Sequence, residues 1–249
     1  MTFHDTPDRI AFCGDWHANL RYAQSVIRRL ADNGVTHIVH TGDFGWLFQT
    51  SFIADLETAL NTAGIYLGFV DGNHEDFNYL NNLDDPRITP HIRHIRRGER
   101  WEWSGVSFLG LGGAHSVDRP HRKPNVSWWA AETLGHIDVE RAIEGGRADV
   151  MVCHDVPAGV RVPGIEGSPF GFHPHELRLA DQHRDVLRVV VDEVQPARLF
   201  HGHYHVRYTD VLRGDGYVTV VDGLAHDGEP LMANVALADL ASLSRADSV

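Results

Sequence analysis

Short apolar runs alternate with amphipathic stretches over the first third of the chain. The runs Arg9–Cys13, Thr36–His40 and Ile65–Val70 are predicted to be buried strands. Between them, residues 20–33 and 52–60 carry apolar side chains at helical spacing and are predicted to be helices. Strands that alternate with helices in this way form a parallel sheet with right-handed crossovers.

The hydrophobic pattern changes after residue 100. Trp101–Trp103 and Val106–Leu111 flank a Ser-Gly pair, which predicts a hairpin. Val156–Pro174 is rich in proline and glycine and is predicted to be a long loop, a type of segment that often covers a binding site. The other expected elements are a helix at Ile137–Ile143, a strand at Ala148–Cys153, a helix at His175–Val194, a strand at Arg198–His201, a hairpin over Tyr204–Val221 and a strand at Met232–Leu237. We therefore expect residues 1–249 to form a single α/β domain, with two packed sheets and helices outside them.

The composition narrows the functional classes. The 249 residues include 22 Lys and Arg against 34 Asp and Glu, a formal net charge of −12. Tight, charge-driven binding to nucleic acid needs clustered cations and is not expected, although bound metals could still attract a nucleotide. Met1–Arg9 has no apolar signal-peptide core, and no apolar run approaches the ~18 residues of a membrane span. Cys13 and Cys153 lie in apolar segments, which is typical of a cytoplasmic protein with buried thiols.

Nearly every predicted strand leads into residues of the types that bind metals. Because strand ends define the ligand crevice of an α/β sheet, these side chains should meet at one edge. Residues i and i+2 of an extended chain point the same way, so the pairs 15 and 17, and 203 and 205, should enter one cavity together. The candidate ligands are Asp15, His17, Asp43, Asn73, His154, His203 and His205.

These motifs also occur together in one family. The ordered set Asp-x-His, Gly-Asp, Gly-Asn-His-Glu, His and Gly-His-x-His, from Asp15 to His205, resembles the calcineurin-like metallophosphoesterases. Each motif alone is common in turns and caps, but turns do not explain the whole set in this order. The resemblance implies a β-sandwich of two mixed sheets flanked by helices, and a binuclear metal centre. It also implies that Asp43 bridges the ions, that Asp15, His17 and His205 complete the first site, and that Asn73, His154 and His203 complete the second.

The resemblance assigns His74 the role of general acid. Two divalent ions carry more positive charge than the carboxylates of Asp15 and Asp43 cancel, so charge remains for a hydroxide and a phosphate. Ions about 3.5–4 Å apart can orient a bridging hydroxide for in-line attack. Mixed carboxylate, imidazole and amide ligands favour transition metals, with Mn²⁺ expected first and Fe or Zn as alternatives. His74 follows Asn73 directly, so it should lie close enough to the ions to protonate the leaving alkoxide.

A second cluster of polar residues follows the strand that ends at Leu111. It contains His115, Arg119, Arg122 and Lys123, which concentrate positive charge in an acidic chain. We interpret these four residues as candidate contacts to a substrate phosphate, because guanidinium groups bind phosphate oxygens strongly. A solvated surface loop is the alternative interpretation.

The sequence departs from the Ser/Thr protein phosphatases of this family at three positions. Trp46 and Leu47 stand where that branch has an aspartate that orients the acid histidine and an arginine that binds phosphate, and Asp71 replaces a second arginine. A dianionic phosphomonoester would lose two clamps, whereas a phosphodiester has one charge fewer and needs them less. Asp71 should also add negative charge near the site. We therefore expect a phosphodiesterase for cyclic nucleotides or other small phosphodiesters.

Other functions remain open on the sequence. A phosphomonoesterase or Ser/Thr protein phosphatase could use the loop from Arg119 to Lys123 in place of the missing arginines. A nuclease is disfavoured by the net charge of −12, and a non-catalytic scaffold by the presence of every ligand and of the acid. The expected partner is a small phosphoester, with nucleotides among the candidates. No membrane partner is expected, and the oligomeric state is open.

Overall fold

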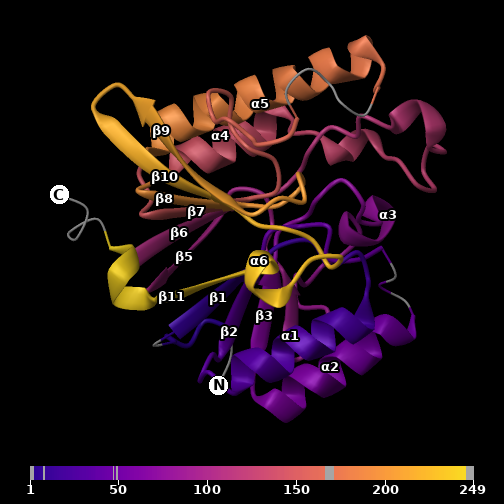
Figure 1. Cartoon of the computed structure of the whole chain (residues 1–249), viewed down its shortest axis with the longest axis vertical. Coiled ribbons are helices and arrows are strands. Elements are labelled where there is room, and N and C mark those ends of the chain that lie inside the picture. The colour runs from indigo at the N-terminus through magenta and orange to yellow at the C-terminus, as the bar shows by residue number, and fades with distance from the viewer. Residues whose placement is uncertain (1–2, 8, 47, 49, 166–170, 245–249) are drawn as a thin grey trace.

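The computed structural model describes residues 3–7, 9–46, 48, 50–165 and 171–244, and these form two β-sheets between two layers of helices (Figure 1). The first sheet has the order β11 (Val235–Asp239), β1 (Arg9–Cys13), β2 (His37–His40), β3 (Tyr66–Phe69) and β4 (Ile92–His94). The second has the order β5 (Glu99–Trp103), β6 (Val106–Leu111), β7 (Val150–Cys153), β8 (Arg198–His201), β10 (Tyr217–Gly223) and β9 (Tyr208–Gly214). The inner pairings are parallel and antiparallel strands lie at the edges, so the prediction of two mixed sheets flanked by helices is confirmed.

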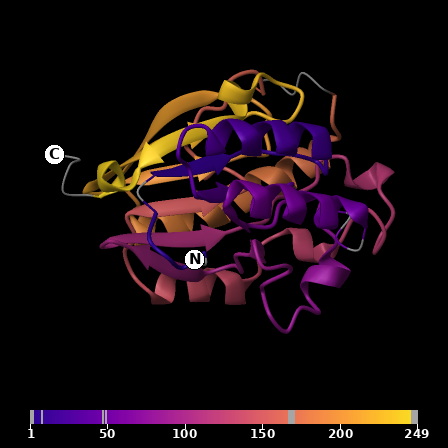
Figure 2. The same ribbon diagram turned by 90° about the horizontal axis from the view of Figure 1, so that it is seen from below.

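The helices form the two outer layers. Helices α1 (Leu20–Ala31) and α2 (Ser51–Ala63) cover the first sheet, and α4 (His136–Glu144) and α5 (Pro174–Val194) cover the second. Figure 2 shows α1 and α2 side by side across the first sheet. Two short helices, α3 (Phe77–Leu80) and α6 (Leu231–Asn234), and 3₁₀ turns at Arg119–His121, Ala130–Glu132 and Leu240–Leu243 complete the described elements.

Apolar side chains pack between the sheets and on both outer faces. Phe12 of β1 and Phe200 of β8 stack between the sheets, with ring centroids 3.6 Å apart. Ile27 and Leu56 bury one face of α1 and α2 against the first sheet, and Leu187 of α5 does the same on the second. Each such side chain contributes about 1.5–3 kcal/mol when fully buried. This packing holds the two sheets in a fixed relation, so loops from both can share one site.

Most predicted elements are confirmed to within a few residues, and the differences have local causes. The predicted last strand at Met232–Leu237 is wrong at its start, because α6 occupies Leu231–Asn234 and β11 begins at Val235. Pro230 is the N-cap of this helix, and proline is accepted at a helix start because the first N–H groups have no intrahelical partner. Elements α3 and β4, of four and three residues, are too short to show a periodicity in sequence.

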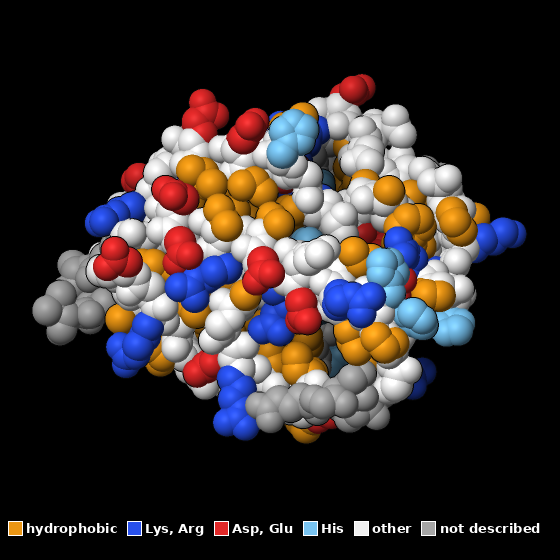
Figure 3. Space-filling model, turned by 90° about the horizontal axis from the view of Figure 1, so that it is seen from above, with side chains coloured by type: hydrophobic (Ala, Val, Ile, Leu, Met, Phe, Trp, Pro, Cys, Tyr) orange, Lys and Arg blue, Asp and Glu red, His pale blue; other side chains and the backbone are white. Residues whose placement is uncertain are grey.

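Charged side chains of both signs occur together on one face of the molecule. Figure 3 shows one face on which Lys and Arg lie scattered among Asp and Glu. That face offers no continuous basic surface of the kind that grips a nucleic-acid backbone. No described helix combines the length and the apolar character needed to cross a membrane.

Candidate active site

The loops after β1, β2, β3, β7 and β8 carry all seven candidate ligands. Neighbouring strands among them are parallel, so their carboxyl ends lie along one edge of each sheet. Asp43 lies between histidines from the two sheets. Its Oδ2 lies 3.7 Å from His17 Nε2, and its Oδ1 lies 3.4 Å from His154 Nε2. The packing of the two sheets therefore gathers side chains from both around one buried carboxylate.

A first group of ligand-type atoms surrounds Asp15. Its Oδ2 lies 3.2 Å from His205 Nε2 and 4.0 Å from His17 Nε2. Asp15 is fully buried, whereas the side chain of His205 is 43% exposed. The carboxylate is therefore the buried part of the group, and the two imidazoles lie nearer to the solvent.

A second group lies on the other side of Asp43. The Oδ1 atom of Asn73 is 3.1 Å from His154 Nε2, and the ring of His203 is centred 5.0 Å from that of His154. The amide of Asn73 has a defined orientation, because its Nδ2 donates to Ser116 Oγ at 3.1 Å. Its oxygen therefore faces the site, as an amide ligand requires.

Two imidazoles have hydrogen bonds that fix their tautomer. His154 Nδ1 donates to the carbonyl of Thr41 at 2.8 Å, and His17 Nδ1 donates to Asp227 Oδ1 at 2.9 Å. In the neutral form of each ring, this leaves the Nε2 lone pair directed at the centre, the arrangement usual for metal-bound histidines. Asp227 is held in turn by Asn19 Nδ2 at 2.6 Å. No pattern in the sequence indicates this role, because Asp227 lies outside every motif.

The backbone of the ligand loops lies in the left-handed region. The φ angles are +45° at His17, +48° at Asp43, +67° at His203 and +59° at His205. The argument that residues i and i+2 converge on extended chain is therefore wrong, because tight turns and not strands aim these side chains. Such conformations are costly for residues other than glycine and concentrate at functional sites. At Gly202 a Cβ would collide with Asp15 Oδ1, so that position must stay without a side chain.

The buried carboxylates set the electrostatics of the site. Burial opposes the ionisation of Asp43, yet the surrounding imidazoles, His154 first, hold its pKa well below the ordinary range. Burial also opposes protonation of His154, but Asp43 and Asp15 outweigh it and raise the pKa of His154 to about 10. The same balance raises the pKa of His17 to about 9. The site therefore attracts positive charge strongly.

These side chains fit a centre of two divalent cations. Two overlapping sets, Asp15 with His17 and His205, and Asp15 with Asp43 and His154, each place their ligand-type atoms within 4.8 Å of one another. Carboxylate and imidazole donors with one amide oxygen suit Mn, Fe or Zn. The roles of the seven residues as ligands stay predictions that metal analysis can test.

His74 lies beside this centre with Arg122 as its neighbour. Its Nε2 is 3.9 Å from Asp43 Oδ2 and 2.7 Å from Nη2 of Arg122. A guanidinium has no acceptor, so Arg122 donates and Nε2 of His74 accepts. Burial lowers the pKa of His74, and Arg122 lowers it further against the effect of Asp43. Arg122 therefore contacts His74, which lacks the aspartate partner found in the Ser/Thr protein phosphatases. Trp46, at the position of that aspartate, has its ring centroid 6.0 Å from the ring centroid of His74. Leu47 lies outside the described residues.

The four predicted phosphate contacts have different positions. Arg122 borders the site and also donates to the carbonyl of Asn73 at 3.1 Å. His115 and Arg119 both pair with Glu176 of α5, each at 2.8 Å. These two contacts attach the loop to α5. Lys123 is exposed to solvent. Sequence alone could not separate the four, because Glu176, the partner of His115 and Arg119, is 57 or more residues away from both.

The expected effect of Asp71 needs a correction. Its carboxylate is buried and receives hydrogen bonds from Arg97 at 2.6 and 2.9 Å. Burial alone would raise the pKa of Asp71, but Arg97 and His94 lower it below its ordinary value. The negative charge is therefore neutralised within the protein, and it does not oppose a dianionic substrate as the sequence suggested.

Two buried glutamates support the ligand loops from behind. Glu75 accepts from the backbone N–H groups of Phe44 and Gly72, each at 2.7 Å. Burial, with the charge of Asp43, raises the pKa of Glu75 to about 8. Glu132 hydrogen-bonds Ser116, the residue that orients the amide of Asn73. Glu132 is far from every motif, so its contribution was not predicted.

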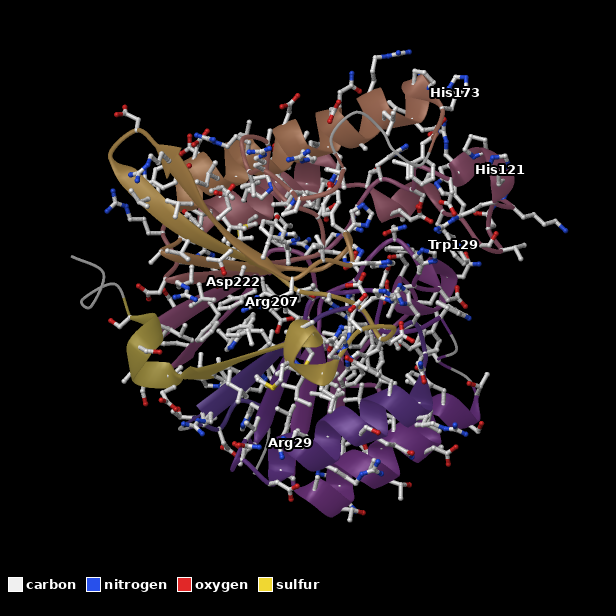
Figure 4. All side chains as sticks on the ribbon, in the orientation of Figure 1. Arg29, His121, Trp129, His173, Arg207 and Asp222 are labelled. Atoms are coloured by element: carbon white, nitrogen blue, oxygen red, sulfur yellow. The ribbon has the colours of Figure 1, made fainter. Side chains whose placement is uncertain are left out.

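The loop of His203 and His205 is anchored at its far end. Arg207, at the end of the loop, lies close to Asp222 of β10 (Figure 4), with Arg207 Nη1 3.3 Å from Asp222 Oδ1. Arg198 also pairs with Asp222, at 2.7 Å. These ion pairs join the start of β8, the end of the loop and β10, so the end of the loop is attached to the second sheet.

A cavity of about 590 Å³ opens onto the candidate centre. Its described lining includes the site residues Asp43, Asn73, His74, His203 and His205, and the apolar side chains of Val117, Ile165, Phe172, Leu177 and Ala180. The volume lies within the range of about 300–1,000 Å³ that is usual for small-molecule sites.

Comparisons with known proteins agree with this geometry. The sequence model of the calcineurin-like phosphoesterases matches residues 8–207, and a comparison with curated proteins finds no match. TT1561 of Thermus thermophilus has 14% identity and a TM-score of 0.57, over 94% of this chain and 99% of that one. A dimetal phosphatase from Danio rerio has 13% identity and a TM-score of 0.57, over 95% and 93%. A purple acid phosphatase from yellow lupin (Lupinus luteus) seeds has 12% identity and a TM-score of 0.51, over 89% and 44%.

Identities this low establish a shared fold and nothing further. The family match is stronger, because it spans most of the chain and includes all seven candidate ligands and His74. This chain belongs to the calcineurin-like phosphoesterase family.

Proposed function

We propose that this chain is a metal-dependent phosphodiesterase for small substrates, with cyclic nucleotides among the candidates. Family membership implies hydrolysis of phosphoester bonds. The preference for a diester rests on the number of cations that face the cavity. Among the described residues, Arg122 is the only arginine or lysine that both lines the cavity and contacts the candidate centre. A dianionic monoester is held best by several bidentate groups, whereas a monoanionic diester needs fewer.

The side chains of this site have distinct roles in such a reaction. Two divalent ions held there would supply positive charge for the phosphate and a nucleophile at neutral pH. Arg122 lies where it can donate to a phosphate oxygen, which is a stronger acceptor than a neutral imidazole. A bound phosphate would therefore draw Arg122 away from His74. The freed Nε2 of His74 could then carry a proton to the leaving oxygen.

A phosphomonoesterase, which includes a Ser/Thr protein phosphatase, is the second candidate. The observation in its favour is the ion pair of Asp71 with Arg97, which removes one electrostatic objection to a dianion. Arg122 could then serve as the single clamp. The diester remains the first proposal, because one guanidinium must neutralise more charge on a monoester.

The two candidates differ in one activity panel. The protein is reconstituted with Mn²⁺ and assayed on bis-p-nitrophenyl phosphate, p-nitrophenyl phosphate, 2′,3′- and 3′,5′-cyclic nucleotides and a phosphopeptide. We expect a higher kcat/KM for the diester than for the matched monoester. A preference for p-nitrophenyl phosphate or the phosphopeptide in the same buffer would overturn the diesterase proposal and leave the family assignment intact.

A further inference from the structure

Part of the lining of the cavity beside the candidate centre is apolar, and the hydrolytic reaction has no use for this part. We call it the apolar chamber and define it by Val117, Ile165, Phe172, Leu177 and Ala180. A phosphate bound at the metal-type residues would be too small to fill a cavity of about 590 Å³. The apolar chamber is therefore available to the organic part of a substrate.

One face of α5 contributes to this chamber. Leu177, Ala180, Asp181 and Arg184 follow the i, i+3, i+4, i+7 spacing that places residues on one side of a helix, and all four line the cavity. They are partly or fully exposed, unlike Leu187 in the later part of the helix, which is buried against the second sheet. The N-terminal half of α5 thus presents to the cavity a face that no other described element covers fully.

The charges around the apolar chamber do not favour a second phosphate. Beyond the metal-type residues, the described lining contains two carboxylates and two guanidinium groups. Asp118 pairs with Arg122 at 2.8 Å, and Arg184 donates to the carbonyls of Val156 and Val160 at 3.3 and 2.8 Å. The two carboxylates balance the two guanidinium groups in charge, so a polyphosphate would find no surplus positive charge in this part of the lining. Apolar walls with a few fixed polar groups are the usual setting for a ring system.

We propose that the substrate carries a flat aromatic group, of the class to which nucleobases belong, and that this group lies in the apolar chamber while its phosphate lies at the candidate metal centre. The proposal rests on the proposed function, because it assumes that a phosphoester binds at the centre. It excludes inorganic polyphosphates and short alkyl phosphoesters as preferred substrates. Phe172 supplies a ring for stacking, and Leu177 and Ala180 supply a smooth helical surface.

Two phosphonates test the proposal by binding alone. Methylphosphonate and phenylphosphonate present the same anionic group through a P–C bond that phosphoester hydrolysis does not break. Isothermal titration calorimetry on the Mn²⁺-loaded protein should give a Kd for phenylphosphonate at least ~10-fold lower, because even one methylene in an apolar pocket is worth about 10-fold or more. Phe172→Ala should reduce this ratio several-fold. Ala180→Trp, which fills the chamber, should abolish the ratio and change the Kd of methylphosphonate by less than about 2-fold.

A matched control lies on the same helix. Val189 is 53% exposed and does not line the cavity, so Val189→Ala should keep the wild-type ratio. Equal Kd values for the two phosphonates, or a ratio that Phe172→Ala and Ala180→Trp both leave unchanged, would overturn the proposal. Circular dichroism confirms that each variant is folded, and Phe172→Ala decides the matter if Ala180→Trp is not. Failure of the proposed function would be separate, since it would appear as an absence of diester turnover and not as a change in binding ratio.

Discussion

The ion pair of Asp71 with Arg97 offers a stability test with a magnitude that follows from the structure. The side chains are 2% and 11% exposed, and Arg97 contacts Asp71 Oδ2 at 2.6 Å through Nη2 and at 2.9 Å through Nε. Asp71→Asn keeps the shape but removes the charge. The carboxylate of Asp138, at 3.3 Å, then remains as a charged partner of Arg97, beside backbone carbonyls. Loss of one partner of a buried pair costs about 3–5 kcal/mol, and the remaining Asp138 contact places our expectation at about 3 kcal/mol.

Thermal unfolding of the metal-free protein measures this loss. Each kcal/mol lowers Tm by about 2–4 °C for a chain of this size, so Asp71→Asn should unfold about 6–12 °C below wild type at pH 7. Asp85 forms an exposed pair with Arg87 and provides a matched control. Asp85→Asn should leave Tm close to wild type, because solvent screens such pairs.

The Tm difference between wild type and Asp71→Asn should also depend on pH, in a direction that follows from the pKa of Asp71. The folded-state pKa of Asp71 is depressed, because the lowering by Arg97 and His94 exceeds the raising by burial. A depressed carboxyl pKa stabilises the fold fully above its unfolded value of about 4, and this contribution is lost as pH falls through the folded pKa. The Tm gap between wild type and Asp71→Asn should therefore narrow below about pH 4. Equal Tm values at pH 7, or a gap that widens in acid, would refute the reasoning.

Three further substitutions test the site. His74→Ala should keep both metals and lose about 10²–10⁴-fold in turnover, with a smaller loss on p-nitrophenyl than on alkyl esters; equal losses would contradict the acid role. Asp227→Asn should weaken Mn²⁺ binding by about 10–100-fold, because Asp227 orients His17, and an unchanged affinity in metal titrations would exclude that role. Arg122→Met should raise KM for the diester by about 10-fold or more, and an unchanged KM in steady-state assays would show that Arg122 does not hold the phosphate.

The positions of most strands along the chain and the residues at their ends could be predicted from the sequence, because both depend on short local patterns. Apolar runs such as Arg9–Cys13 identify the strands, and the polar residues after them identify one edge of each sheet. The local geometry could not be predicted. The left-handed conformation of His203 and His205 depends on how their loop closes. The residue types in this loop do not distinguish a tight turn from an extended segment.

Long-range partners explain what sequence reasoning missed. His74 has Arg122 as its neighbour, 48 residues away, and His17 has Asp227, 210 residues away. Asp71 shows the opposite error, since its position beside a ligand motif suggested an active-site charge. Its pairing with Arg97, 26 residues away, becomes visible only in the folded chain. The effect of a charged residue on the electrostatics of a site can therefore be judged only when its ion-pair partner is known.

The central claim is that Asp43 joins two metal ions in a phosphoester hydrolase. Elemental analysis of Mn²⁺-reconstituted wild type and Asp43→Asn, with bis-p-nitrophenyl phosphate hydrolysis measured on the same samples, tests it most directly. The side chain of Asp43 lies 3.7 Å from His17 and 3.4 Å from His154. We therefore predict about two ions per active wild-type chain, and loss of both occupancy and activity in Asp43→Asn. An active wild-type protein with one ion or none, or an Asp43→Asn variant that keeps two ions and full activity, would contradict the claim.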